Sequence, residues 1–326
     1  MFNDWQNAAH LVPALKSELE QNTPSIEATF FVIDDGSTER ASAGDLSALQ
    51  DSQVVLMHLP RNVGHQRAII AGIVLALEND PECVIVMDSD GEDKPETVSR
   101  LLVQMGKSPG KIVVAKRGAR FESAAFRTLY VGHKIIFRLL VGQSLDFGNF
   151  LLLPLPAARR IAQMPEALNH FPAAILKSRV AITRVNADRG KRRFGKSKMN
   201  MERLISHSFS SLSIFTEQIM VRLVIFSFFA TVMSALAAAA VVAVRFSTDL
   251  ATPGWATAAL GLLVVFSLQF LSFAGLATLM TLNVSTLKHH LSGKDIEPHA
   301  SKAMTVGWKS GPGEPDSSVH AFEDSR

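Results

Sequence analysis

Residues 82–96 read ECVIVMDSDGEDKPE, and in this stretch an apolar run passes directly into a cluster of carboxylates. Cys83 to Met87 have the length and the β-branched content of a strand that is buried on both faces, as in a parallel sheet. In open α/β sheets, ligands bind in the crevice beyond the carboxyl ends of the strands. We therefore expect a ligand site directly after this strand.

The acids that follow this strand suit a divalent cation. Asp88 and Asp90 stand at alternate positions, the flexible Gly91 comes next, and Glu92 and Asp93 follow. Carboxylate oxygens arranged in this way can face one cation that still takes outside oxygens, typically those of phosphates. An acidic turn in which Asp93 caps a helix opened by Pro95 has the same composition, so this segment alone leaves both interpretations open.

Three more stretches read as strands and define the fold class. They are residues 28–33, 53–59 and 111–115, and apolar helical patterns alternate with them. Strands that alternate with helices predict a parallel sheet with helical crossovers, and hence an α/β fold. A helix is also predicted near the start of the chain, over residues 1–20.

Polar groups follow two of these strands. Asp34, Asp35 and Gly36 end the first and could hold a ribose or a base edge, although a plain β-turn with a helix cap looks the same. After the second, the sequence RNVGHQR (61–67) suits a tight turn before a helix whose N-terminus offers free amide donors. His65 and Gln66 are expected only to shape that turn.

Composition narrows the class of partner. A net charge of +3 is too weak to indicate nucleic acid, and no basic segment is interleaved with aromatic residues. The single cysteine excludes an internal disulfide, which fits a domain that faces a reducing compartment.

Two basic segments follow the predicted sheet. The first, beyond Lys116, carries Arg117, Arg127 and further cations along an amphipathic helix, which suits a membrane surface, a phosphate-bearing lipid or simply a solvated face. The second, DRGKRRFGKSK (188–198), packs six positive charges around two glycines. Such a loop is suited to bind a diphosphate, and contact with anionic lipid is the alternative.

The last third of the chain predicts membrane insertion. Residues 201–220 have one apolar face, typical of a helix that lies in the membrane interface. Residues 223–244 and the core of 260–282 are uncharged and long enough to span a bilayer. Lysines and arginines before the first span and after the second place both ends in the cytoplasm by the positive-inside rule. The tail beyond Ser301 is predicted to be disordered.

Four motifs together resemble a known family. They are VIDDGST (32–38), RNVGHQRAIIAG (61–72), MDSDGEDKPE (87–96) and RRFGKSKM (192–199). In order and spacing they are similar to the membrane-associated GT-A glycosyltransferases of family 2, of the dolichol- or polyprenyl-phosphate sugar synthase type. Each motif alone is weak, but together they cover most of residues 1–221.

The resemblance implies an architecture and an activity. A Rossmann-like, mostly parallel GT-A domain would occupy residues 1–200, an interfacial helix 201–220, a transmembrane hairpin 221–287 and a cytoplasmic tail 288–326. The enzyme would move one sugar, with inversion, from a UDP- or GDP-linked donor to polyprenyl phosphate at the cytoplasmic face of a bacterial inner membrane. Two membrane helices per chain can hardly seal around anything alone, so we also expect a homo-oligomer, of a stoichiometry that the sequence does not give.

The resemblance also assigns residues on the donor side. Asp34 and Asp35 match the acids that read the base and the ribose, and Asp4 lies near the acidic position that usually closes the first strand. Asp88 and Asp90 match the DXD pair that holds Mg²⁺ or Mn²⁺. The remaining matches are Glu92, at a metal-contacting position, and Arg192, Ser197 and Lys198, in the loop over the diphosphate. Arg117 and Arg127 match the residues that receive the lipid phosphate.

Two departures from the family pattern stand out. Many members have Gly-Asp-Phe-Arg where this chain has Gly-Asn-Phe-Leu at 148–151, so Asn149 replaces a carboxylate credited with positioning the acceptor. The usual first strand is also missing upstream of Met1, which suggests that the assigned start is too late. These departures motivate one alternative, a catalytically silent protein that binds nucleotide sugar. A processive polysaccharide synthase is the other, but its usual Gln-x-x-Arg-Trp motif and extra spans are not found.

Overall fold

The computed structural model describes residues 1–51, 53–117, 124–188, 190, 194, 201–247 and 254–290, and it leaves out the side chains of residues 117–130, 133, 201–204 and 281–290. Its strands are β1 (Phe30–Asp34), β2 (Val54–His58), β3 (Cys83–Val86), β4 (Ile112–Arg117), β5 (Leu151–Pro154) and β6 (Ile182–Ala187). The helices of the N-terminal part are α1 (Trp5–Asn22), α2 (Ala43–Leu49), α3 (His65–Leu77), α4 (Glu96–Lys107), α5 (Ala124–Val141), α6 (Leu155–Ala162) and α7 (Phe171–Lys177), with a 3₁₀ turn at Pro165–Leu168. The C-terminal part consists of α8 (Met201–Ser213), α9 (Thr216–Ser247) and α10 (Trp255–His290).

The strands form a Rossmann-like arrangement, as expected. β1 and β2 pair in parallel as a two-stranded sheet, and the other sheet has the order β3-β5-β4-β6. β4 and β6 are parallel, whereas β5 runs antiparallel to both β3 and β4. Within the described residues, no strand joins the two sheets.

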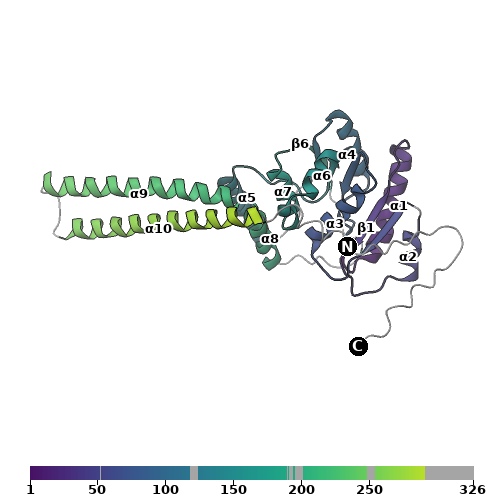
Figure 1. Cartoon of the computed structure of the whole chain (residues 1–326), viewed down its shortest axis with the longest axis horizontal. Coiled ribbons are helices and arrows are strands. Elements are labelled where there is room, and N and C mark those ends of the chain that lie inside the picture. Colours follow the sequence, from purple (N-terminus) through teal and green to yellow (C-terminus); the bar gives the residue numbers. More distant parts are fainter. Residues whose placement is uncertain are drawn as a thin grey trace.

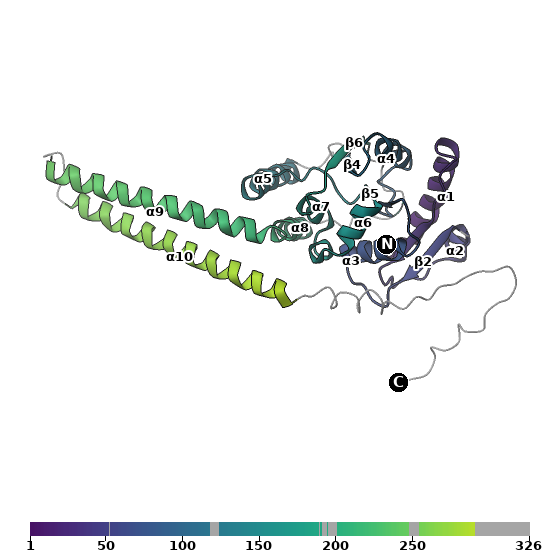
Figure 2. The ribbon, with the colours of Figure 1, turned by 45° about the horizontal axis from the view of Figure 1, so that its top comes forward.

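The core lies on both faces of the larger sheet. Successive side chains of a strand point to opposite faces, so Val114 and Leu151 pack on one side while Val113 and Leu152 pack on the other. Helices α3, α6 and α7 cover the first face and α1 and α4 the second, with helices on either side of the strands in Figure 2. All four of these strand side chains are 0% exposed, so the centre of the sheet offers a rigid base for the loops at its ends.

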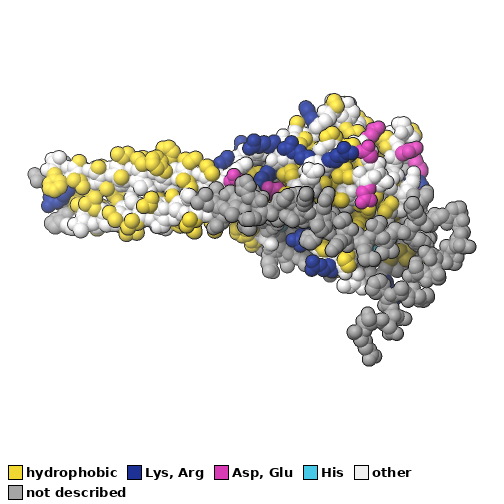
Figure 3. Space-filling model, in the orientation of Figure 1, with side chains coloured by type: hydrophobic (Ala, Val, Ile, Leu, Met, Phe, Trp, Pro, Cys, Tyr) yellow, Lys and Arg dark blue, Asp and Glu magenta, His cyan; other side chains and the backbone are white. Residues whose placement is uncertain are grey.

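Two long helices leave this domain as an antiparallel hairpin (Figure 1). The segments Thr216–Ser247 and Trp255–Met280 are long and apolar enough to cross a membrane, and almost none of their apolar windows is buried inside the protein. Figure 3 shows apolar side chains over the length of the hairpin. A soluble protein would bury such helices, so the hairpin fits membrane anchoring. Both predicted spans fall within α9 and α10.

The base of the hairpin is hydrogen-bonded to the N-terminal part. The Arg222 guanidinium donates to the carbonyl oxygens of Leu139 (3.1 Å) and Leu140 (2.7 Å) at the C-terminus of α5. Lys177 donates to the Ile214 carbonyl at 2.9 Å, in the turn between α8 and α9. A cation at a helix C-terminus satisfies carbonyls that have no partner within the helix, so these contacts hold the hairpin against the domain.

Candidate active site

The carboxylates at the end of β1 are both buried and both hydrogen-bonded. Asp34 accepts from the Ser37 amide (3.1 Å) and hydroxyl (2.5 Å), and it lies 3.0 Å from Nδ1 of His58. Asp35 accepts from the amides of Val63 (2.7 Å) and Gly64 (3.1 Å). Asp35 therefore fastens the 61–64 turn, and the start of α3 behind it, to the end of β1.

Gly36 allows this close approach of two backbone segments. Its φ is +67°, and a Cβ built on it would lie 2.4 Å from the carbonyl carbon of Arg61 and 2.5 Å from the amide nitrogen of Asn62. Only glycine combines that conformation with that contact. The structure thus explains why the VIDDGST motif has a glycine at this position.

His65, Asp88 and Asn149 meet at the ends of three different elements. Nε2 of His65 lies 3.2 Å from Oδ1 of Asp88 and 2.9 Å from Nδ2 of Asn149. Nδ2 of Asn149 also donates to Asp88 Oδ1 at 3.3 Å. Oδ1 of Asn149 is buried and has no hydrogen-bond partner within the described part of the chain. Such an orphaned acceptor is unusual in a folded protein and is typical of a site that receives a ligand.

His65 is the site residue that sequence reasoning missed. We expected it only to shape a turn, but it is the first residue of α3 and its ring faces the acid after β3. The available signal was its position directly after the turn that leads to a helix N-terminus beside the crevice. Only the packing of α3 against the sheet brings it to Asp88.

The start of the chain is hydrogen-bonded to the end of β1. The Met1 ammonium donates to the Ile33 carbonyl at 2.5 Å, and Asp35 donates its amide to the Met1 carbonyl at 2.7 Å. Burial lowers the pKa of this ammonium, while Asp34, Asp35, Asp4 and Asp88 each act to raise that pKa. The charges of these four carboxylates therefore act on the same ammonium group. Asp4 is further held by the Asn7 amide (2.7 Å) and the Ser89 hydroxyl (3.3 Å).

The acidic loop after Asp88 meets the described part of the second basic segment. Asp90 accepts from the Glu92 amide at 3.0 Å, and the Glu92 carbonyl accepts from the Gly190 amide at 2.7 Å. Phe194 exchanges two backbone hydrogen bonds with the buried Asn7 side chain. Gly190 and Phe194 thus lie beside the acidic loop and α1. The other predicted basic-loop residues, Arg192, Ser197 and Lys198, lie outside the described residues, as do the side chains of Arg117 and Arg127.

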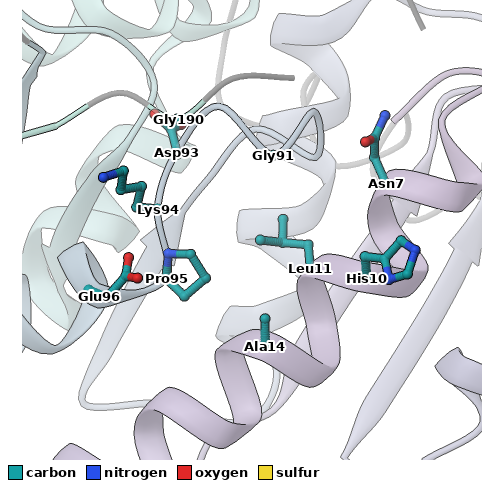
Figure 4. Close-up of a pocket in the computed structure, with 10 residues that line it drawn as sticks. All are labelled: Asn7, His10, Leu11, Ala14, Gly91, Asp93, Lys94, Pro95, Glu96 and Gly190. Atoms are coloured by element: carbon teal, nitrogen blue, oxygen red, sulfur yellow. The ribbon is translucent and has the colours of Figure 1, made fainter. Parts of the chain in front are cut away.

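A cavity of about 260 Å³ lies next to the acidic loop (Figure 4). Residues of α1, such as Asn7, His10 and Leu11, form one wall, and Gly91, residues 93–96 and Gly190 form the other. Asp34, Asp35 and Asp88 do not line it. Sites for drug-sized ligands usually measure about 300–1,000 Å³, so this cavity has room for only part of a nucleotide sugar.

The sequence of the N-terminal part is similar to a known protein family. The model of the family described as Glycosyl transferase family 2 matches residues 1–154. The chain contains a family 2 glycosyltransferase domain. The matched range includes every described acid of the site, together with His65 and Asn149.

Individual relatives are distant. An uncharacterized glycosyltransferase of Bacillus subtilis, YkoT, is 23% identical over 66% of this chain and 65% of its own. An uncharacterized glycosyltransferase of Synechocystis, sll0501, is 24% identical over 83% of this chain and 85% of its own. Undecaprenyl-phosphate 4-deoxy-4-formamido-L-arabinose transferase of Proteus mirabilis is 26% identical over 66% of each chain. This chain therefore shares the family 2 domain with these relatives, but the sequence identity is too low to infer its substrate from theirs.

Proposed function

We propose that this protein transfers a single sugar from a UDP- or GDP-linked donor to a polyprenyl phosphate at the cytoplasmic face of a bacterial inner membrane. The observation that carries this proposal is the contact of His65, Asp88 and Asn149, whose buried Oδ1 has no partner within the described residues, in a family 2 domain that bears a membrane-length hairpin. Acids at strand ends suit a polar, metal-bound donor, and the hairpin brings the domain to a lipid acceptor.

In this proposal the parts of the chain have separate roles. Residues 1–200 hold the catalytic domain, 201–220 contact the interface, 221–287 form the hairpin with both ends cytoplasmic, and 288–326 form the tail. Exposed apolar side chains beside the hairpin support contact with lipid. They include Ile135, Ile136 and Leu139 on α5 and Phe209 on α8. Exposed Lys134 and Arg138 lie among those of α5 and suit anionic lipid.

The residues at the acidic site fit Mg²⁺ or Mn²⁺. Asp88 and Asp90 would provide hard carboxylate oxygens, and Glu92 follows two residues later in the chain. Among the described residues, no group of three or more acids, histidines or cysteines forms an all-protein cage. Mg²⁺ is commonly bound by one or two carboxylates plus substrate phosphates, which agrees with that donor set. When bound, the cation supplies positive charge to the diphosphate that leaves.

The protein groups then perform the binding and the orientation. Asn149 donates to Asp88 and holds that carboxylate at the end of β3. Asp34 and Asp35 recognise the nucleoside, with Asp4 beside them, and Arg192, Ser197 and Lys198 neutralise the diphosphate. Arg117 and Arg127 receive the phosphate of the acceptor. An oxygen of this phosphate attacks the anomeric carbon as the bond to the nucleoside diphosphate breaks, and it carries negative charge at neutral pH without a base.

Asn149→Asp is expected to change kcat with a lipid phosphate acceptor by less than about ten-fold, because an anionic nucleophile gains little from a general base. Asn149→Ala, which removes the hydrogen bonds to Asp88 and His65, is expected to cost about ten-fold or more. Steady-state rates of both variants over a range of pH check this. A hundred-fold gain in Asn149→Asp would instead show that the acceptor needs a base.

Chelation is expected to stop transfer. EDTA added to the full-length enzyme in vesicles should abolish the release of nucleoside diphosphate, and an excess of Mn²⁺ or Mg²⁺ should restore it, because the carboxylates alone repel the diphosphate. EDTA that is already saturated with Mg²⁺ is the control. Undiminished turnover in free EDTA would contradict the assignment of Asp88 and Asp90.

A panel experiment tests the function itself. The purified chain in lipid vesicles is incubated with UDP- and GDP-linked sugars and undecaprenyl phosphate, and lipid-linked sugar is detected by mass spectrometry. The proposal expects product from at least one donor. Binding of a donor without product on any lipid phosphate would favour a catalytically silent protein that binds nucleotide sugar. This is the specific alternative because Asn149 stands where many family members have a carboxylate.

A further inference from the structure

One buried polar atom of the candidate active site has no partner. Oδ1 of Asn149 and Nε1 of Trp255 are the buried side-chain atoms that lack a hydrogen-bond partner within the described residues. Trp255 begins α10 in the hairpin, whereas Asn149 lies beside Asp88. A buried acceptor without a partner destabilises the protein, so a ligand group that pairs with Asn149 would gain binding energy.

The hydrogen bonds around Asn149 determine which end of its amide is unpaired. Nδ2 of Asn149 lies 3.3 Å from Oδ1 of Asp88 and 2.9 Å from Nε2 of His65. An ionised carboxylate only accepts hydrogen bonds, so the amide presents its NH₂ group to Asp88. The reverse orientation would face two oxygens toward each other and leave the NH₂ group unpaired at the buried position. The unpaired atom is therefore the carbonyl oxygen.

The backbone places Asn149 opposite Asp88. β3 and β5 pair antiparallel with Val86 opposite Leu151. Two further residues along each chain lead to Asp88 and Asn149. Opposite residues of an antiparallel pair point to the same face, and the next residue, Phe150, is buried. The sheet thus gives the carbonyl oxygen of Asn149 a fixed place near Asp88, as a binding site requires.

The unpaired oxygen restricts the chemistry of its hydrogen-bond partner. A carbonyl oxygen only accepts hydrogen bonds, so the partner must carry an O–H or N–H group. The diphosphate of a nucleotide sugar has no such group at neutral pH. A lipid phosphate has mostly lost its second proton, since the second pKa of a phosphate monoester is about 6. The hydroxyl groups of a sugar, and the N–H groups of an amino sugar, fit this oxygen.

The sugar of the donor is also the part that would lie nearest. In the proposed function, on which this inference rests, Asp88 holds a cation against the diphosphate, and the sugar is bonded directly to that diphosphate. The ribose carries hydroxyl groups too, but the proposed nucleoside residues, Asp34 and Asp35, follow β1, which belongs to the other sheet. We propose that Oδ1 of Asn149 accepts a hydrogen bond from one hydroxyl or amino group of the donor's sugar, and so selects which sugar the enzyme transfers.

A mutant cycle on donor binding tests this hydrogen bond. The probes are UDP-glucose, UDP-N-acetylglucosamine and GDP-mannose, together with analogues that each lack one hydroxyl of the sugar. Isothermal titration calorimetry measures their affinities for the full-length chain in detergent with Mn²⁺ and without a lipid acceptor. At one position of the sugar, loss of the hydroxyl should weaken binding by about five- to 150-fold in the natural protein. The same loss should cost less than about two-fold in Asn149→Ala, where the hydroxyl has no partner.

Two variants and one analogue serve as controls. Asn149→Asp keeps an acceptor oxygen at this position, so it should retain the penalty for the missing hydroxyl. Asn79→Ala changes an exposed asparagine beyond the far end of α3 and should leave every penalty as it is in the natural protein. The penalty for removing the 2′-hydroxyl of the ribose should be the same in all variants.

The outcomes separate this inference from the proposed function. Penalties that are equal in Asn149→Ala and the natural protein at every position of the sugar would overturn the inference. A raised KM for undecaprenyl phosphate would then assign Asn149 to the acceptor, and a raised Mn²⁺ requirement would assign it to the metal. Lipid-linked product with unchanged penalties overturns this inference alone, whereas altered penalties without product overturn only the transfer reaction. A chain that binds none of these donors would overturn both.

Discussion

Asp88→Asn is expected to lower glycosyl transfer by about 10²- to 10³-fold, the cost of removing one preorganised electrostatic group from a reaction centre. The substitution keeps the size of the side chain and removes the negative charge from the point where β3, the segment before β5 and α3 meet. Its amide can still contact Asn149 and His65, so the fold should be unaffected. The loss should therefore appear in kcat and in metal dependence, and not in thermal stability.

The measurement is the initial rate of nucleoside diphosphate release in vesicles, with the donor that the panel identifies and with increasing Mn²⁺. Asp80→Asn is the matched control, because Asp80 pairs with Arg159 on the surface and both side chains are mostly exposed. Surface pairs contribute about 0–1 kcal/mol, so this variant should behave like the natural protein. A loss of less than about five-fold in Asp88→Asn would remove Asp88 from the catalytic site.

Gly36→Ala is expected to have the largest effect on stability. The added methyl group must lie 2.4 Å from the Arg61 carbonyl carbon, in a backbone conformation that side chains rarely adopt. The positive φ costs about 1–2 kcal/mol and the overlap with backbone about 1–3 kcal/mol more. For a domain of this size, a total of about 2–5 kcal/mol lowers Tm by about 4–20 °C.

Thermal unfolding of the full chain in detergent, followed by near-ultraviolet circular dichroism, checks this value. Gly106→Ala is the control: Gly106 lies inside α4 and a Cβ there meets nothing within 4 Å. Alanine favours a helix over glycine by about 1 kcal/mol, so the control should melt slightly higher than the natural protein. If Gly36→Ala unfolded at the same Tm as the natural protein, the 61–64 turn would be able to move away from residue 36 at no cost in free energy. The hydrogen bonds of Asp35 would then not be what positions His65.

The sequence by itself determined the class of the fold and the nature of the chemistry. A strand such as β3 can be predicted from a short run of β-branched residues. The acids after it can be predicted to form a site because ligands of such sheets bind at the ends of the strands. The two helices of the hairpin can also be predicted from the local sequence, since an uncharged helix of that length is recognised by its composition alone. These features depend on neighbours in the chain, so they can be read without a structure.

The tertiary structure decided the contacts between distant residues. The Leu151–Pro154 run became β5, antiparallel between β3 and β4, because its four side chains can be buried on both faces only there. His65 reached Asp88, and Asn149 joined them, through the packing of α3 and the sheet. Which side of α10 faces α9 depends on how the two helices are rotated against each other. Such arrangements follow from the packing of whole surfaces, which no local pattern specifies.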